Sequence, residues 1–148
     1  MEKTFHMLLY RAFHAQRNFL RPSLEEIGLG AGQPKLITYL AEHGPCHQQE
    51  LANYFEVDPA TVSRMIDSLK KGGFITQVAD ESSRRRNRID LTERGREAAS
   101  QWKARCRQLE EILLQGFDAE GRQRFAGDLR RVYENLHNWK GRAEHGGF

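Results

Sequence analysis

The sequence predicts a mainly α-helical fold with one small β-hairpin, and three observations carry that prediction. Apolar residues recur at helical spacing towards both ends of the chain. Two short helical segments in the middle are separated by the turn Glu56-Val57-Asp58. Directly after Gly72-Gly73, the pattern changes to that of short strands. The 148 residues are enough for a single domain with a buried core.

Two helices are expected at the beginning of the chain. Apolar side chains keep helical spacing from Phe5 to Leu20, and Pro22 lies near the expected end of this first helix. Three glycines then interrupt the pattern before Pro34, a residue type favoured in the first turn of a helix. The second helix is expected to end at Gly44-Pro45, because glycine caps helices and proline cannot continue them.

Two shorter helices and a hairpin are expected next. The third helix holds Leu51 and Phe55 on one face. Asp58-Pro59 predicts the N-cap and first residue of a fourth helix that ends at Gly72-Gly73. Residues 74–78 and 88–91 are β-prone, and the nine residues between them are expected to form the loop of a hairpin.

Two further helices complete the predicted order. Thr92 is expected to cap a long helix, and Asp118 is expected to cap another with apolar residues from Phe125 to Trp139. Two short helices joined by a tight turn and followed by a hairpin describe a winged helix-turn-helix. We expect one domain over residues 1–148, with the winged core at about 34–92 and dimerisation helices at about 3–28 and 93–140.

The flanking helices carry the prediction of a homodimer. Their apolar stripes lie outside the winged core, which is too small to cover them, so a second copy of the chain is expected to do so. The residues that form these stripes are Phe5, Leu8, Leu9, Phe13, Leu129, Val132, Leu136 and Trp139.

Charge is informative through its distribution, because the net charge is only +3, from 23 basic and 20 acidic side chains. Residues 31–57 contain one base and three acids, whereas Ser83–Arg88 contains four arginines and no acid. The alternative interpretation of such a run is an ordinary solvated loop. Its position in the wing loop, directly after a candidate recognition helix, favours contact with double-stranded DNA.

The fourth helix has a predicted core side and a predicted DNA side. Val62, Met65, Ile66 and Leu69 fall on one side, and small, hydroxyl and charged residues fall opposite or near the N-terminus. Hydroxyl groups can hydrogen-bond to phosphates or base edges, and arginine can hydrogen-bond to guanine. Arg64 is therefore expected to reach bases, and the wing arginines are expected to reach phosphates or the minor groove. The expected DNA-binding residues are Pro59, Ala60, Thr61, Ser63, Arg64, Asp67, Ser68, Lys71, Arg84, Arg85, Arg86 and Arg88.

The chain resembles the MarR-type transcriptional regulators in three stretches: Gly44–Ala52, Val57–Ile75 and Asp90–Gly95. This resemblance implies an obligate homodimer that binds a pseudo-palindromic operator, usually represses transcription and is released by a small ligand or by oxidation. The family's wing pattern Asp-x-Arg aligns with Ser83-Arg84-Arg85, so the wing-tip arginine carries over to Arg85 while its acid is missing. Asp80 and Glu81 are the candidates to replace that acid. A hydroxyl residue often caps the family's third helix, where this chain has His47.

The resemblance also implies a pocket for an aromatic carboxylate or a similar amphipathic ligand. The residues that line it by alignment are Tyr10, His14, Arg17, Phe19 and Tyr39. Each of them has an equally good explanation as a packing residue, and the sequence names no ligand.

Other function classes find less support in the sequence. Cys46 and Cys106 are expected to be structural rather than redox-active, and the cluster of His43, Cys46 and His47 would converge poorly on a metal, so no cofactor is expected. There is no nucleophile elbow or phosphate loop, so we do not expect an enzyme. A winged adaptor that binds proteins without DNA is the remaining alternative, as is a redox- or metal-responsive regulator. The absence of an apolar span or signal peptide leads us to expect a cytoplasmic protein without membrane contact.

Overall fold

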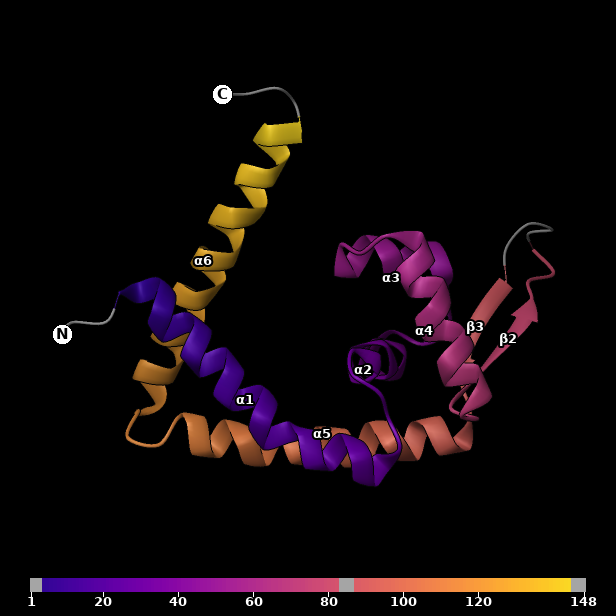
Figure 1. Cartoon of the computed structure of the whole chain (residues 1–148), viewed down its shortest axis with the longest axis horizontal. Coiled ribbons are helices and arrows are strands. Elements are labelled where there is room, and N and C mark those ends of the chain that lie inside the picture. Colours follow the sequence, from indigo (N-terminus) through magenta and orange to yellow (C-terminus); the bar gives the residue numbers. More distant parts are fainter. Residues whose placement is uncertain (1–3, 83–86, 145–148) are drawn as a thin grey trace. The chain divides into compact units, whose positions relative to one another are not determined.

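The computed structural model describes residues 4–82 and 87–144, with side chains as far as Trp139. The chain forms two compact units, Met1–Leu109 and Glu110–Phe148. The elements in chain order are α1 (Phe5–Ile27), α2 (Gln33–His43), β1 (Cys46–His47), α3 (Gln48–Phe55), α4 (Pro59–Lys71), β2 (Ile75–Ala79), β3 (Asn87–Leu91), α5 (Glu93–Leu113) and α6 (Ala119–Glu144) (Figure 1). None of the helices within these described ranges has the length and apolar character that crossing a membrane requires.

Helix α1 ends later than Pro22 suggests. Pro22 lies inside the helix, which continues to Ile27 and is capped by Gly28 at a φ of 89°. A proline within a helix removes one backbone hydrogen bond. The turn beyond it is nevertheless held, because Ser23 is buried and both Leu24 and Ile27 pack against the core. Tertiary packing therefore outweighs the local preference of proline.

The sheet has three antiparallel strands in the order β1-β3-β2. Strands β2 and β3 form the predicted hairpin, with Ile75 opposite Leu91 and Ala79 opposite Asn87. This pairing leaves residues 80–86 between the strands, a shorter connection than the sequence indicates. The sequence did not predict β1, whose Cys46 pairs with Ile89 and whose His47 pairs with Arg88. Strand β1 ties the start of α3 to the hairpin.

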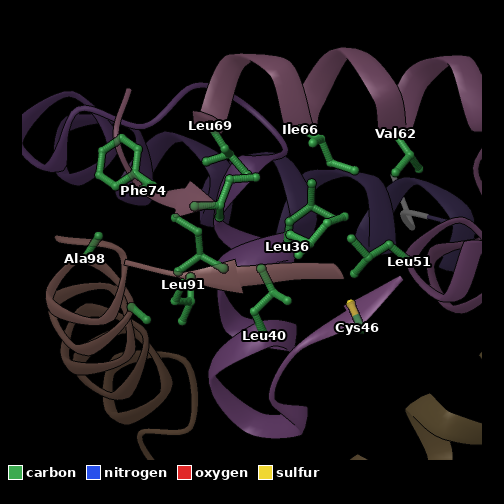
Figure 2. Close-up of a cluster of buried hydrophobic side chains, with 14 of the residues drawn as sticks. Leu36, Leu40, Cys46, Leu51, Val62, Ile66, Leu69, Phe74, Leu91 and Ala98 are labelled. Atoms are coloured by element: carbon green, nitrogen blue, oxygen red, sulfur yellow. The ribbon is translucent and has the colours of Figure 1, made fainter. Parts of the chain in front are cut away.

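The core lies within the helix-turn-helix and the adjoining sheet (Figure 2). Val62, Ile66 and Leu69 of α4 are at most 1% exposed, as their helical spacing predicts. They belong to one cluster with buried residues of α2, α3, β1, β3 and α5, among them Leu36, Leu40, Cys46, Leu51, Leu91 and Ala98. Burying this side of α4 turns its opposite side towards solvent.

The start of α5 is fixed to the turn between α4 and β2. The backbone N–H of Thr92 donates to the Phe74 carbonyl over 3.0 Å, and the Thr92 hydroxyl donates to the Gly73 carbonyl over 2.6 Å. The same hydroxyl accepts from the Gly95 N–H over 3.0 Å, which confirms Thr92 as the predicted cap. Asp118 is likewise confirmed as a cap, since it accepts from the Gly121 N–H over 2.7 Å.

Candidate nucleic-acid interface

Helix α4 begins with the cap that the sequence predicts. The Asp58 carboxylate accepts from the Thr61 N–H over 2.8 Å, and Pro59 occupies the first turn, where its missing N–H costs nothing. The helix that follows carries the predicted DNA-binding residues from Pro59 to Lys71. Pro59, Ala60, Arg64, Asp67, Ser68 and Lys71 are exposed, and Thr61 and Ser63 are half-buried.

A chain of hydrogen bonds orients Arg64. Its guanidinium donates to the Thr61 hydroxyl over 3.2 Å, and that hydroxyl donates to the Asp58 carboxylate over 2.7 Å. The hydrogen bonds from the Thr61 hydroxyl and N–H, and then the nearby charge of Arg64, lower the pKa of Asp58. The carboxylate is therefore ionised at neutral pH and holds Thr61 between itself and Arg64. The exposed guanidinium is directed towards the N-terminal end of α4, the end that enters a DNA groove in helix-turn-helix proteins.

Ser68 has a structural partner that the sequence did not reveal. Its hydroxyl accepts from the Gln33 side-chain amide over 2.7 Å, and Gln33 is only 8% exposed. The carbonyl oxygen of the same amide accepts from the Gly30 N–H over 2.7 Å. Ser68 therefore joins α4 to the first residue of α2, and its hydroxyl already accepts a hydrogen bond within the fold.

The hairpin that follows α4 is the candidate wing. Arg88 is exposed on β3, and it lies opposite Val78 of β2 and His47 of β1. The Lys70 ammonium donates to the Gln77 side chain over 3.3 Å, which connects the end of α4 with the wing. Arg84, Arg85 and Arg86 lie outside the described residues.

Asp80, one of the two candidates for the missing wing acid, lies directly after β2, at the loop-side end of the wing strands. Its carboxylate accepts from the Ser82 N–H over 3.0 Å and from the Ser82 hydroxyl over 2.7 Å. It also forms an ion pair with His47 over 3.0 Å. His47 precedes the first residue of α3, yet its side chain makes no capping hydrogen bond there. Sequence reasoning missed this pair, since nothing local connects residues 47 and 80.

The five candidate ligand residues do not form one group. Tyr10 stacks on His14, with ring centroids 6.0 Å apart. Phe19 lies under the guanidinium of Arg105 of α5, 4.4 Å from the ring centroid. Tyr39 packs in an aromatic cluster with His43, Tyr54 and Phe55.

Arg17 is the member of the five that lines a hollow of about 600 Å³ in the first unit. Apolar side chains of α1, α2 and α5 surround this hollow, among them Leu20, Leu24 and Trp102. Three cationic side chains also line it, those of Arg17, Arg21 and Lys35, together with the acid Glu25.

The two cysteines lack the environment of reactive thiols. Cys46 is 4% exposed, and burial, together with the charge of Glu50, raises the pKa of its thiol to about 11. Burial also raises the pKa of Cys106. Reactive thiols need a lowered pKa and access to solvent. Among the described side chains, those of residues 4–82 and 87–139, no three of His, Cys, Asp or Glu are placed to share a metal ion.

Comparison with known proteins agrees with this arrangement. Residues 30–86 match the model described as the MarR family. YybA of Bacillus subtilis, an uncharacterized HTH-type transcriptional regulator, is 27% identical over 112 residues, which are 76% of this chain and 75% of YybA. The crystal structure of MarR matches with a TM-score of 0.78 and 26% identity over 95% of each chain. A putative MarR family regulator from Listeria monocytogenes in complex with a 26mer DNA matches in fold, with a TM-score of 0.84 and 20% identity over 100% of this chain and 98% of its own.

The fold defines a winged helix-turn-helix protein. The chain is similar to transcriptional regulators of the MarR family. The curated relatives that it matches are described as HTH-type transcriptional regulators.

Proposed function

We propose that the protein is a cytoplasmic repressor that binds a pseudo-palindromic operator as a homodimer and is released by a small aromatic ligand. The observation that carries the DNA-binding part is the exposed side of α4, where Asp58 and Thr61 orient Arg64. Arg64 then contacts base edges in the major groove, while Arg88 and the neighbouring wing arginines contact phosphates or the minor groove. The other exposed residues of α4, Lys71 among them, contribute contacts at the edge of this surface.

A gel-shift titration tests the DNA-binding part. The probe is the intergenic DNA beside the protein's own gene, and the competitor is a scrambled duplex of equal length and composition. A regulator of this kind binds the intergenic probe with a clear preference at physiological salt. Equal weak binding to both duplexes would instead favour a winged adaptor that acts on proteins. Increased transcription of the adjacent gene after deletion distinguishes a repressor from an activator.

Exposed apolar side chains support the homodimer. Phe5, Leu8 and Phe13 of α1 are each more than half exposed, at 64%, 52% and 55%. Within the second unit, Leu129 and Leu136 of α6 are exposed at 46% and 61%. Apolar stripes of this kind on helices outside the core are typical of surfaces that a second subunit covers. Light scattering after size-exclusion chromatography should therefore give twice the mass of the chain at micromolar concentration.

The hollow between α1, α2 and α5 supports the ligand part of the proposal. Its walls combine an indole and several aliphatic side chains with three cations, which suits an aromatic ring that bears a carboxylate. Isothermal titration with a panel of hydroxybenzoates tests this. Arg17→Ala should weaken binding, whereas Arg11→Ala, on the same helix but outside the hollow, should not. If no compound of the panel binds to the wild-type protein, the hollow is a packing gap and the ligand part is refuted.

A further inference from the structure

One imidazole contacts both ends of the segment that connects the wing strands. The His47 Nε2 lies 3.0 Å from the Asp80 Oδ2, and Asp80 directly follows the last residue of β2. The His47 Nδ1 lies 3.2 Å from the backbone carbonyl oxygen of Asn87, the first residue of β3. His47 itself ends β1 and adjoins the first residue of α3. The side chain therefore connects the loop-side end of the wing strands with the beginning of the helix-turn-helix.

The protonation state of His47 decides how many of these contacts are favourable. A backbone carbonyl and an ionised carboxylate are both acceptors, and a neutral imidazole carries only one N–H. In either neutral tautomer, one ring nitrogen therefore points a lone pair at an acceptor. The imidazolium carries two N–H groups and donates to Asn87 and Asp80 at the same time.

The surroundings keep Asp80 ionised and shield the pair in part. The hydrogen bonds from Ser82, and then the charges of His47 and Arg88, lower the pKa of Asp80. The His47 and Asp80 side chains are only 21% and 17% exposed. Two other charged groups lie near the pair along the chain: Arg88 is paired with His47 across β1 and β3, and Glu50 lies in the first turn of α3.

We propose that His47 is a positioning residue for the wing, and that its imidazolium form ties the loop-side ends of β2 and β3 to the start of α3 and thereby strengthens DNA binding. The inference rests on the proposed function, in which α4 and the wing contact the same duplex. A wing fixed relative to α4 loses less conformational freedom when both bind, so operator affinity rises as His47 gains its second proton.

Operator affinity measured from pH 8 to pH 6 at constant ionic strength tests the proposal in His47→Gln, Asp80→Asn and the wild-type protein. The operator affinity of the wild-type protein should rise by roughly threefold for each wing between pH 8 and pH 6, as expected for a partly exposed ion pair. His47→Gln keeps one amide donor but does not titrate, and Asp80→Asn keeps a side-chain acceptor for Ser82 but loses its charge. Both variants should lose this rise in operator affinity. His43→Gln alters an exposed histidine on α2 and is the matched control, since it should retain the wild-type dependence.

A second measurement needs no DNA. Amide hydrogen exchange, corrected for the intrinsic pH dependence, reports opening of the β2–β3 ladder at the paired residues Ala79 and Asn87. Protection there should increase on acidification in the wild-type protein and stay constant in His47→Gln. If exchange behaves in this way but the protein binds no duplex, the role of His47 in holding the wing stands and the proposed function fails. If His47→Gln and the wild-type protein have equal pH dependence in both measurements, the proposal is overturned.

Discussion

Gly95→Ala is the substitution for which the structure makes its sharpest prediction. A Cβ atom at residue 95 would lie 2.0 Å from the Phe74 carbonyl oxygen and 3.0 Å from the Leu91 Cδ2, whereas ordinary contacts lie between 3.4 and 4 Å. Because the closest atom belongs to the backbone, no side-chain rotation relieves the clash. The beginning of α5 has to move away from Phe74 by more than an ångström.

That movement would disturb the contacts between the start of α5 and the turn that precedes β2. Overpacking typically costs about 1–3 kcal/mol. The hydrogen bonds from Thr92 to Gly73 and Phe74 would also weaken, at about 1 kcal/mol each. Alanine recovers about 1 kcal/mol through its better helix propensity. We therefore expect a net loss of about 2–4 kcal/mol in the free energy of unfolding.

Urea denaturation followed by circular dichroism measures this loss, at a fixed protein concentration because dimerisation contributes to stability. Gly127→Ala is the matched control, since a Cβ at this position of α6 meets no described atom within 4 Å. It should gain about 0.5–1 kcal/mol from helix propensity alone. A Gly95→Ala variant as stable as the wild-type protein would show that the approach of α5 to Phe74 is not as close as described.

Three further predictions concern DNA binding, assembly and the thiols. Arg64→Ala should cost about 1–3 kcal/mol of binding free energy on the operator and much less on scrambled DNA. Arg86→Ala should weaken binding to both duplexes similarly. It should also reduce the slope of log affinity against log salt concentration by about one for each phosphate that is no longer neutralised. Titrations of both variants at several salt concentrations distinguish the effect of Arg64→Ala from that of Arg86→Ala. Leu136→Lys should shift the chain towards monomer in sedimentation experiments and lower its stability, because a charge then enters the proposed dimer interface. Because burial holds the pKa of Cys46 at about 11 and raises that of Cys106, Ellman's reagent should react slowly with the native protein and rapidly in urea. Peroxide should leave the gel shift unchanged, and release of DNA by peroxide would contradict the structural role of the cysteines.

The elements that the sequence predicted well are those with local signals. Asp58-Pro59 opens α4 and Thr92 caps α5, because capping depends on residues within one turn of each other. The helical period also placed Arg64 on the side of α4 opposite the core. The sequence did not predict strand β1, because a strand of two residues is too short to show an alternation of apolar and polar side chains.

The alignment placed the candidate ligand residues in one pocket, whereas helical periodicity separates some of them. Tyr10, His14 and Arg17 follow one another at spacings of four and three, so they share a side of α1. Phe19 is two residues beyond Arg17 and therefore points elsewhere, in agreement with its contact with Arg105. Tyr39 packs with Tyr54 through the fold of α2 against α3, which no local pattern encodes.

Two departures from the family pattern that are separate in the sequence become a single feature in the structure. The sequence has His47 where a hydroxyl cap is usual, and it lacks the acid that normally precedes the wing-tip arginine. In the folded chain His47 does not cap α3, and its imidazole faces Asp80 instead. The His47 ring contacts both the Asp80 carboxylate and the Asn87 carbonyl oxygen, which a shorter hydroxyl side chain at residue 47 would not span. Because the side chains of His47 and Asp80 contact each other, substitutions at residues 47 and 80 should be coupled rather than additive.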